Sequence, residues 1–188
     1  MKHRPLVFLD IETTGASARS SRITEIGALR VEEGVIVGKF SELVNPEEHI
    51  PAFISRMTGI TDEMVWDSPT FQGIAHELEY FMDGAVFIAH HVNFDYSFIR
   101  EEYAKLKNNF SMDRACTVRL DRRLYPEQRS HALDRIIERM GLEVANRHRA
   151  FDDAEVLWKF FEFELRQRGL DMFVHLEKSM TRARTVGT

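Results

Sequence analysis

Apolar runs of strand length alternate with polar turns in the first half of the chain. The segment "LVFLDIE" at residues 6–12 has four apolar residues in succession, which predicts a strand buried on both faces. Residues 22–46 predict two more strands, which are joined at "EEG" and form a hairpin closed by Pro46. A further short strand is expected at "AVFIAH", residues 85–90.

Apolar residues at helical spacing predict the helices. The stripe in residues 68–84, for example, repeats every three or four positions and stops at Gly84. Because predicted strands and helices alternate, we expect an α/β sandwich. The other expected helical segments are two short helices within residues 50–65 that are separated at Gly59, a helix at residues 94–106, a strand passing into a short helix within residues 113–126, and helices at residues 130–142 and 149–169.

Length and composition favour one compact domain. The 188 residues are 44% hydrophobic, and no segment rich in proline, glycine or serine divides them. We expect a single domain over residues 1–176 and a basic, flexible tail at residues 177–188. No apolar run approaches the roughly 20 residues that cross a bilayer, so we expect a cytoplasmic protein without a membrane partner. The single cysteine, Cys116, excludes an internal disulfide and a zinc site made of several cysteines.

Positive charge is concentrated in one part of the chain. The formal net charge is -5, which by itself argues against a polyanionic partner. Residues 114–149, however, hold nine arginines and five acidic residues, a local charge of +4. This asymmetry is consistent with a surface that faces phosphates, and equally with arginines on solvated helices.

Four acidic residues stand at the ends of predicted core elements. Asp10 and Glu12 are two apart in a strand, so their side chains lie on the same side. Two such charges about 4 Å apart repel by on the order of 4 kcal/mol at an effective dielectric constant near 20. Residues 6–17 contain no Lys or Arg to offset this repulsion. Asp95 and Asp153 each fall near the start of a predicted helix, where a carboxylate is also favourable without any further role.

Together the four acids form a candidate set of hard oxygen ligands. Such ligands suit Mg²⁺ or Mn²⁺, whereas zinc prefers histidine and cysteine. His148, five residues before Asp153, precedes the last long helix. A histidine there can take a proton from an attacking water, or it can simply be a polar loop residue. His90 and His91 are interpreted as residues at a strand end.

The segments "DIETTG" (10–15), "AHHVNFD" (89–95) and "HRAFDDA" (148–154) resemble the three motifs of the DEDD superfamily of 3′–5′ exonucleases, in its histidine subgroup. That subgroup is typified by the proofreading epsilon subunit of bacterial replicative polymerases. The resemblance implies a ribonuclease H-like three-layer fold with a mixed five-stranded sheet flanked by helices. It also implies two divalent cations, Mg²⁺ or Mn²⁺, held by four acidic residues, and a histidine as general base. On this chain these would be Asp10, Glu12, Asp95 and Asp153, with His148.

By the same analogy, Thr13, Thr14 and Gly15 would lie beside the terminal nucleotide and offer backbone amides to it. The chain departs from the family pattern at His91, where Asn is frequent, and at Thr58, where His is frequent. The expected substrate is a single-stranded or frayed 3′ end, in DNA for proofreading or repair, with RNA 3′-end processing as the alternative. A nucleic-acid-binding module without catalysis and an aspartate-nucleophile phosphatase are more distant alternatives. The motifs specify neither a polymerase partner nor an oligomeric state.

Overall fold

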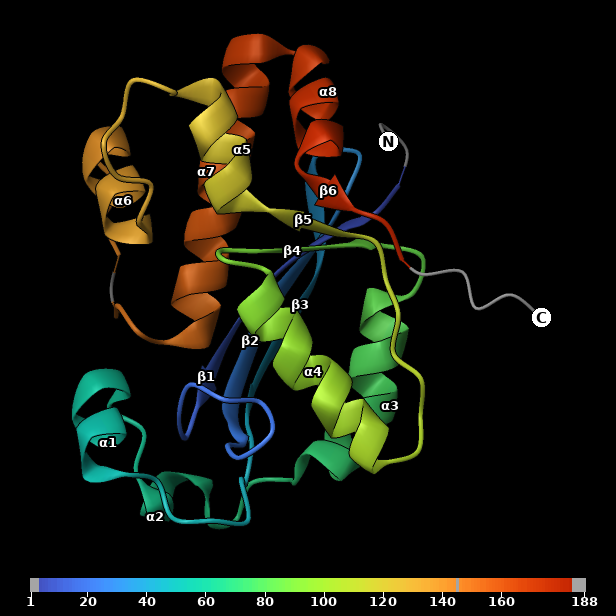
Figure 1. Ribbon diagram of the computed structural model, residues 1–188, viewed down its shortest axis with the longest axis vertical. Coiled ribbons are helices and arrows are strands. Elements are labelled where there is room, and N and C mark those ends of the chain that lie inside the picture. Colours follow the sequence, from blue (N-terminus) through green and yellow to red (C-terminus); the bar gives the residue numbers. More distant parts are fainter. Residues whose placement is uncertain (1–3, 145, 184–188) are drawn as a thin grey trace.

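The fold is built on one mixed β-sheet (Figure 1). The computed structural model describes residues 4–144 and 146–183. The described strands follow the order β3-β2-β1-β4-β5-β6, with β1 antiparallel to β2 and parallel to β4. Their bounds are β1 (Leu6–Thr13), β2 (Ile23–Glu32), β3 (Val35–Leu43), β4 (Val86–Ala89), β5 (Arg114–Cys116) and β6 (Met180–Thr181).

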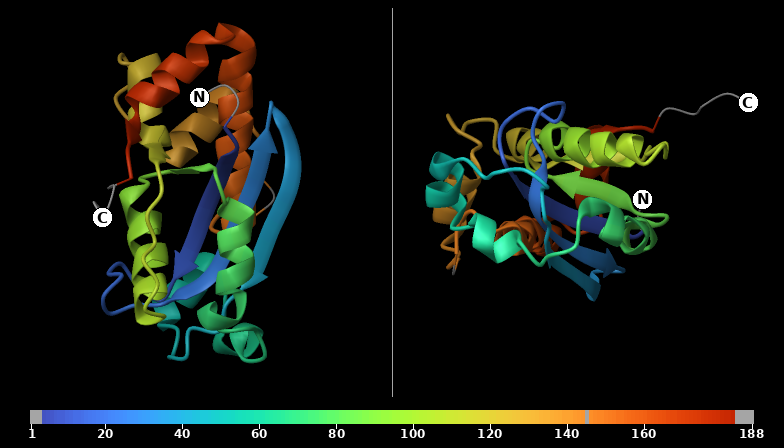
Figure 2. Two further views of the ribbon diagram at one scale, coloured as in Figure 1. Left: turned by 90° about the vertical axis from the view of Figure 1, so that its right-hand side faces the viewer. Right: turned by 90° about the horizontal axis from the view of Figure 1, so that it is seen from below.

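Helices cover both faces of the sheet, so the predicted three-layer sandwich is confirmed. One hydrophobic cluster joins the sheet to α3 and α4, and a second joins the opposite face to α5, α6, α7 and α8. In the view from below in Figure 2, α4 and α7 lie on opposite sides of the strands. The helices are α1 (Ala52–Thr58), α2 (Asp62–Val65), α3 (Phe71–Met82), α4 (Asn93–Lys105), α5 (Thr117–Leu124), α6 (Leu133–Met140), α7 (Ala150–Arg168) and α8 (Asp171–Lys178).

The first strand explains the apolar run that opens the chain. Val7 and Leu9 pack in the cluster on the α3 and α4 face, while Leu6 and Phe8 pack in the cluster on the α7 face. All four side chains are buried, because β1 lies inside the sheet between β2 and β4. Successive residues in a strand point to opposite faces, so burial on both faces requires a continuous apolar sequence.

The C-terminal segment differs from the expected flexible tail. The expected boundary at residue 176 falls inside α8, and Ser179 after it is fully buried. Met180 and Thr181 then form β6 against β5, which gives the sheet one strand more than the five expected. Asp113 accepts hydrogen bonds from the Arg182 side chain and the Ala183 backbone N–H. Residues 177–183 are therefore part of the fold, and the rest of the expected tail, residues 184–188, lies outside the described residues.

None of the helices within residues 4–144 and 146–183 combines the length and the apolar character that crossing a bilayer requires.

Candidate active site

The four predicted carboxylates come from one strand and two helices. Asp10 and Glu12 lie near the end of β1, on the face that α7 covers, as their two-residue spacing predicts. Asp95 lies in the first turn of α4 and Asp153 in the first turn of α7. The two helices begin on opposite faces of the sheet, so the acids reach the end of β1 from both sides.

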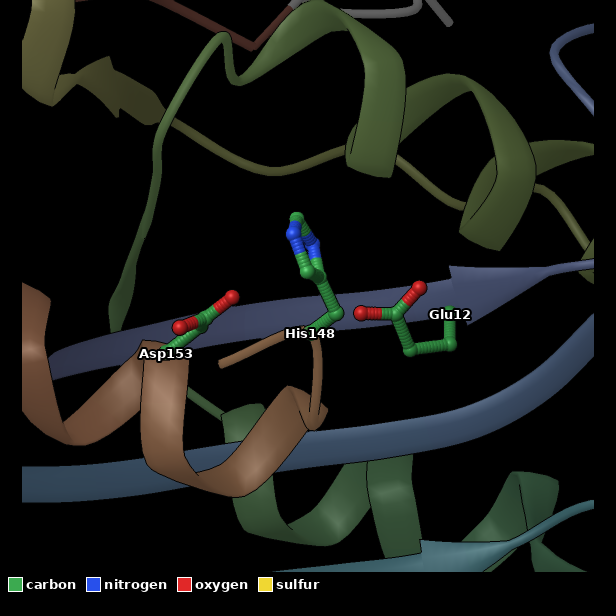
Figure 3. Close-up of side chains that lie close together, drawn as sticks. All are labelled: Glu12, His148 and Asp153. Carbon is green, nitrogen blue, oxygen red and sulfur yellow. The ribbon is translucent and has the colours of Figure 1, made fainter. Parts of the chain in front are cut away.

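Glu12, His148 and Asp153 form a compact group. Each offers one ligand atom, and these atoms all lie within 4.8 Å of one another. Figure 3 shows the Glu12 and Asp153 carboxylates with the His148 imidazole beside them. Glu12 and Asp153 are buried, whereas His148 is exposed. The structure therefore brings the expected base to the two carboxylates.

Burial raises the pKa of all four carboxyl groups, and repulsion from neighbouring carboxylates adds to it at Asp10 and Glu12. The pKa of Glu12 is raised to about 8, first by burial and then by the negative charges of Asp153, Glu25 and Asp95. The pKa of Asp10 is raised well above its usual range by burial and then by Asp95, Asp153 and Glu12. The charges of Asp95, Asp153 and Glu12 act on Asp10, and those of Asp153 and Asp95 act on Glu12, so the four groups share one electrostatic site.

The helix-borne acids are affected in the same direction. Burial raises the pKa of Asp95 to about 8, although the backbone N–H groups of Asp95 itself and Ile11 oppose the shift. Burial also raises the pKa of Asp153, against the nearby Arg147. One buried oxygen, Oδ2 of Asp95, has no hydrogen-bond partner among the described residues. An unpaired carboxylate oxygen in a site with excess negative charge fits a hard divalent cation.

Arg147 adds a cation that the local sequence around Asp10 and Glu12 does not provide. Residues 6–17 contain no Lys or Arg, so a side chain that offsets the repulsion has to come from elsewhere in the chain. In the structure, the Arg147 guanidinium donates to Oδ1 of Asp153, and its Nε lies 2.9 Å from Oδ1 of Asp134 on α6. This arginine supplies part of the compensation. The tripeptide "RHR" at residues 147–149 was the available signal, since it places a cation on each side of His148.

Sequence reasoning also missed an ion pair beside the site, between the partly exposed Arg149 and a buried glutamate. Arg149 binds Glu25 on β2 in a bidentate manner, with distances of 3.0 Å from Nε to Oε1 and 2.6 Å from Nη2 to Oε1. Glu25 is directly opposite Glu12 in the sheet. Its Oε2 also accepts the backbone N–H of Ala150, the first residue of α7. The glutamate in "ITEIG" carried no signal of this role, because its partner is distant in the sequence.

His90 and His91 lie outside the group of Glu12, His148 and Asp153. Nδ1 of His90 lies 2.9 Å from Oγ1 of Thr117. Burial lowers the pKa of His90 to about 4, and His91 contributes in the same direction, so His90 is neutral near pH 7. The interpretation of both as residues at the end of β4 agrees with this placement.

The segment after Glu12 uses most of its polar groups internally. Oγ1 of Thr13 donates to the Gly15 carbonyl at 2.8 Å, and Oγ1 of Thr14 donates to Oε1 of Glu48 at 2.5 Å. The Thr14 backbone N–H donates to the Arg22 carbonyl at 2.9 Å. The expectation that this amide is available to a nucleotide is therefore wrong for Thr14. Contact of Thr13, Thr14 and Gly15 with substrate stays a prediction.

A ribonuclease H-like sheet with four converging carboxylates and a histidine defines a nuclease-type acidic site. Residues 7–161 match the family RNase_T, described as "Exonuclease". The chain belongs to this family, in its DEDDh group of 3′–5′ exonucleases. The expected superfamily and fold are thus confirmed.

Relatives and a solved structure share this domain. The chain is 35% identical over 177 residues to the DNA polymerase III PolC-type protein of Clostridium perfringens (strain 13 / Type A). This alignment covers 93% of this chain and 12% of that protein. It is 36% identical over 166 residues to the 3′-5′ exonuclease DinG of Bacillus subtilis (strain 168), covering 86% and 18%. The chain thus spans less than a fifth of either relative. Exonuclease X in complex with 5′ overhanging duplex DNA has the same fold, with a TM-score of 0.74 at 23% identity over 93% of this chain and 99% of that one.

Proposed function

We propose that this protein removes nucleotides one at a time from the 3′ end of DNA and releases nucleoside 5′-monophosphates. The observation that carries the proposal is the convergence of Asp10, Glu12, Asp95 and Asp153 from β1, α4 and α7. Their pKa values are all raised, mainly by burial, and this supports a site that additional positive charge would stabilise. These four residues would hold two divalent cations, Mg²⁺ or Mn²⁺.

The residues divide the chemistry between them. When bound, two divalent cations supply the positive charge that an anionic phosphodiester and its departing 3′ oxygen require. Asp10 and Glu12 orient the site, because a strand inside the sheet holds them rigidly. His148 lies beside Glu12 and Asp153 and is less buried than either, and there its imidazole takes the proton of the attacking water.

DNA is proposed as the substrate because of the relatives. One is a DNA polymerase III PolC-type protein and another is a 3′-5′ exonuclease, and both align across more than four fifths of this chain. The catalytic carboxylates themselves do not read the sugar, since discrimination depends on contacts to the 2′ position. RNA is therefore a separate arm of the test.

The test uses 5′-labelled single-stranded DNA, duplex DNA with a mismatched 3′ end, and RNA of the same sequence. We expect a stepwise ladder on DNA with Mg²⁺ or Mn²⁺ and none in a chelator. His148→Ala should slow the single-turnover rate by about 10² to 10⁴-fold, the usual contribution of a positioned general base.

A matched pair of variants separates the site from general charge effects. Asp153→Asn removes a proposed ligand, whereas Asp67→Asn removes an exposed carboxylate that has no contact with the site. The first should lose the ladder and the second should keep it. Undiminished cleavage by Asp153→Asn would contradict the proposed site, and a ladder on RNA alone would replace DNA by RNA as the substrate.

A further inference from the structure

His148 is held in an unusual backbone conformation. Its φ is +61°, in the left-handed region that residues other than glycine seldom adopt. Such a conformation persists only where the surrounding structure enforces it. Contacts of the residues on either side of His148 must therefore supply the restraint.

Arg149, directly after His148, is fixed by a buried partner. Its guanidinium binds Glu25 through both Nε and Nη2, and Glu25 is only 3% exposed. A planar guanidinium bound in this two-point manner has a defined orientation as well as a charge partner. Because Glu25 also accepts the Ala150 N–H, the same carboxylate fixes the first residue of α7.

The start of α7 has no space to move toward the sheet. A Cβ at Gly27 on β2 would lie 2.1 Å from the Phe151 nitrogen and 2.2 Å from the Ala150 carbonyl carbon. The backbone at the start of α7 therefore packs directly against Gly27 of β2, which lies two residues after Glu25 in the strand. This contact limits where His148 can lie, because only two peptide bonds separate His148 from Ala150.

Glu25 lies on the strand next to the catalytic one. Its register partner on β1 is Glu12, which is also a member of the group with His148 and Asp153. The Arg149–Glu25 pair thus connects the backbone at His148 to the end of the sheet that carries Glu12. Glu25 is not a member of the group formed by Glu12, His148 and Asp153.

We propose that Arg149 and Glu25 are positioning residues for His148. Their ion pair holds the imidazole beside Glu12 and Asp153, and its main effect on the rate of cleavage passes through His148. The inference rests on the proposed exonuclease function, because it assigns His148 as the group being positioned.

The test compares Arg149→Gln, Arg149→Lys and Glu25→Gln with the wild type. We expect Arg149→Gln and Glu25→Gln to lower the single-turnover rate by about 10 to 100-fold. A displacement of about 1 Å in a catalytic group can cost up to about 10²-fold in rate. KM should change by less than about threefold. Arg149→Lys should restore part of the rate, because lysine keeps the charge but not the two-point geometry.

A second background decides whether the effect passes through His148. In His148→Ala, adding Arg149→Gln should lower the rate by less than about threefold, because the group being positioned is already absent. Arg166→Gln is the matched control, since this exposed arginine pairs with Glu162 on α7, and its rate should equal the wild type. Thermal melting of every variant shows that it folds, and Arg149→Lys and Glu25→Gln carry the test if Arg149→Gln does not.

The outcomes separate the two proposals. Wild-type cleavage together with wild-type rates in Arg149→Gln and Glu25→Gln would overturn the inference and leave the proposed function intact. An equal loss on adding Arg149→Gln to wild type and to His148→Ala would also overturn it, since the pair would then act independently of the histidine. A wild-type protein that releases no mononucleotides would overturn the proposed function, and the inference with it.

Discussion

Raising the pH in the absence of divalent cations should destabilise this protein. The folded-state pKa values of Glu12 and Asp95 are about 8, whereas their ordinary values are 4.5 and 3.8. Between these values the folded state holds protons that the unfolded state has released. The free energy of unfolding therefore falls as the pH rises toward 8, which is the reverse of the behaviour of a salt-bridged carboxylate.

The window from pH 6.5 to 8 isolates this effect. Burial lowers the pKa of His90 from 6.5 to about 4, so its unfolded form binds a proton that its folded form rejects. That histidine makes stability rise with pH mainly below pH 6.5, at which half of its unfolded form is already neutral, and the rise that remains above this pH is less than about 1 kcal/mol. Asp113, whose pKa is lowered to about 2, and the depressed Asp62 lose their contributions only at more acidic pH.

The magnitude follows from the shifts. A carboxyl with a folded pKa of about 8 loses on the order of 1 to 2 kcal/mol of stabilisation between pH 6.5 and 8. Glu12 and Asp95 together give on the order of 3 kcal/mol. For a domain of this size, the melting temperature changes by about 2 to 4 °C for each kcal/mol, so a decrease of about 6 to 12 °C is expected.

Divalent cations should remove this dependence. A carboxyl group must be deprotonated to bind a metal ion. Mg²⁺ or Mn²⁺ therefore stabilises the ionised carboxylates of Glu12 and Asp95, which are unfavourable in the folded protein without a cation. Thermal unfolding followed by circular dichroism at pH 6.5, 7.0, 7.5 and 8.0, in chelator and in saturating Mn²⁺, measures both curves. Glu12→Gln should show a smaller slope than the wild type in chelator, and Asp67→Asn the full slope. A melting temperature that is constant or rises over this window in chelator would refute the reasoning.

Three further perturbations test single contacts. Asp10→Asn should reduce cleavage at least about 10³-fold yet raise the melting temperature in chelator by about 2 to 4 °C, because one of the repelling charges is gone. Gly27→Ala should destabilise the protein by about 3 kcal/mol in urea unfolding, whereas Gly73→Ala, whose Cβ would meet only the Pro69 side chain, should change it by less than about 1 kcal/mol. Arg147→Gln should increase Mn²⁺ affinity about tenfold by calorimetry, since it removes a competing cation from Asp153; equal or weaker binding would contradict this.

The sequence was sufficient for what depends on local spacing. Asp10 and Glu12 share a side because strand side chains alternate, and the apolar run before them marks a strand buried on both faces. The helices of residues 71–82 and 133–140 could be read from their apolar stripes and from the glycines that follow. Gly141 has φ of +61°, the left-handed cap that ends such a helix.

The remaining features depend on contacts between distant segments. The Arg149–Glu25 pair joins residues 124 apart, and only the antiparallel register of β1 and β2 places Glu25 opposite Glu12. The strand at Met180 and Thr181 is two residues long, which is too short to give a repeating pattern of apolar residues in the sequence. Its presence depends on the free edge of β5 and on the carboxylate of Asp113.

The two halves of the acidic site differ in how the protein compensates them. Asp95 and Asp153 lie in the first turns of α4 and α7, where the partial positive charge of a helix N-terminus favours a carboxylate. Asp153 has Arg147 in addition. Asp10 and Glu12 project from a strand, which has no comparable dipole, and their nearest charged neighbours are mostly acidic. Because the fold leaves the strand-borne pair least compensated, we infer that this pair depends most strongly on bound divalent cations.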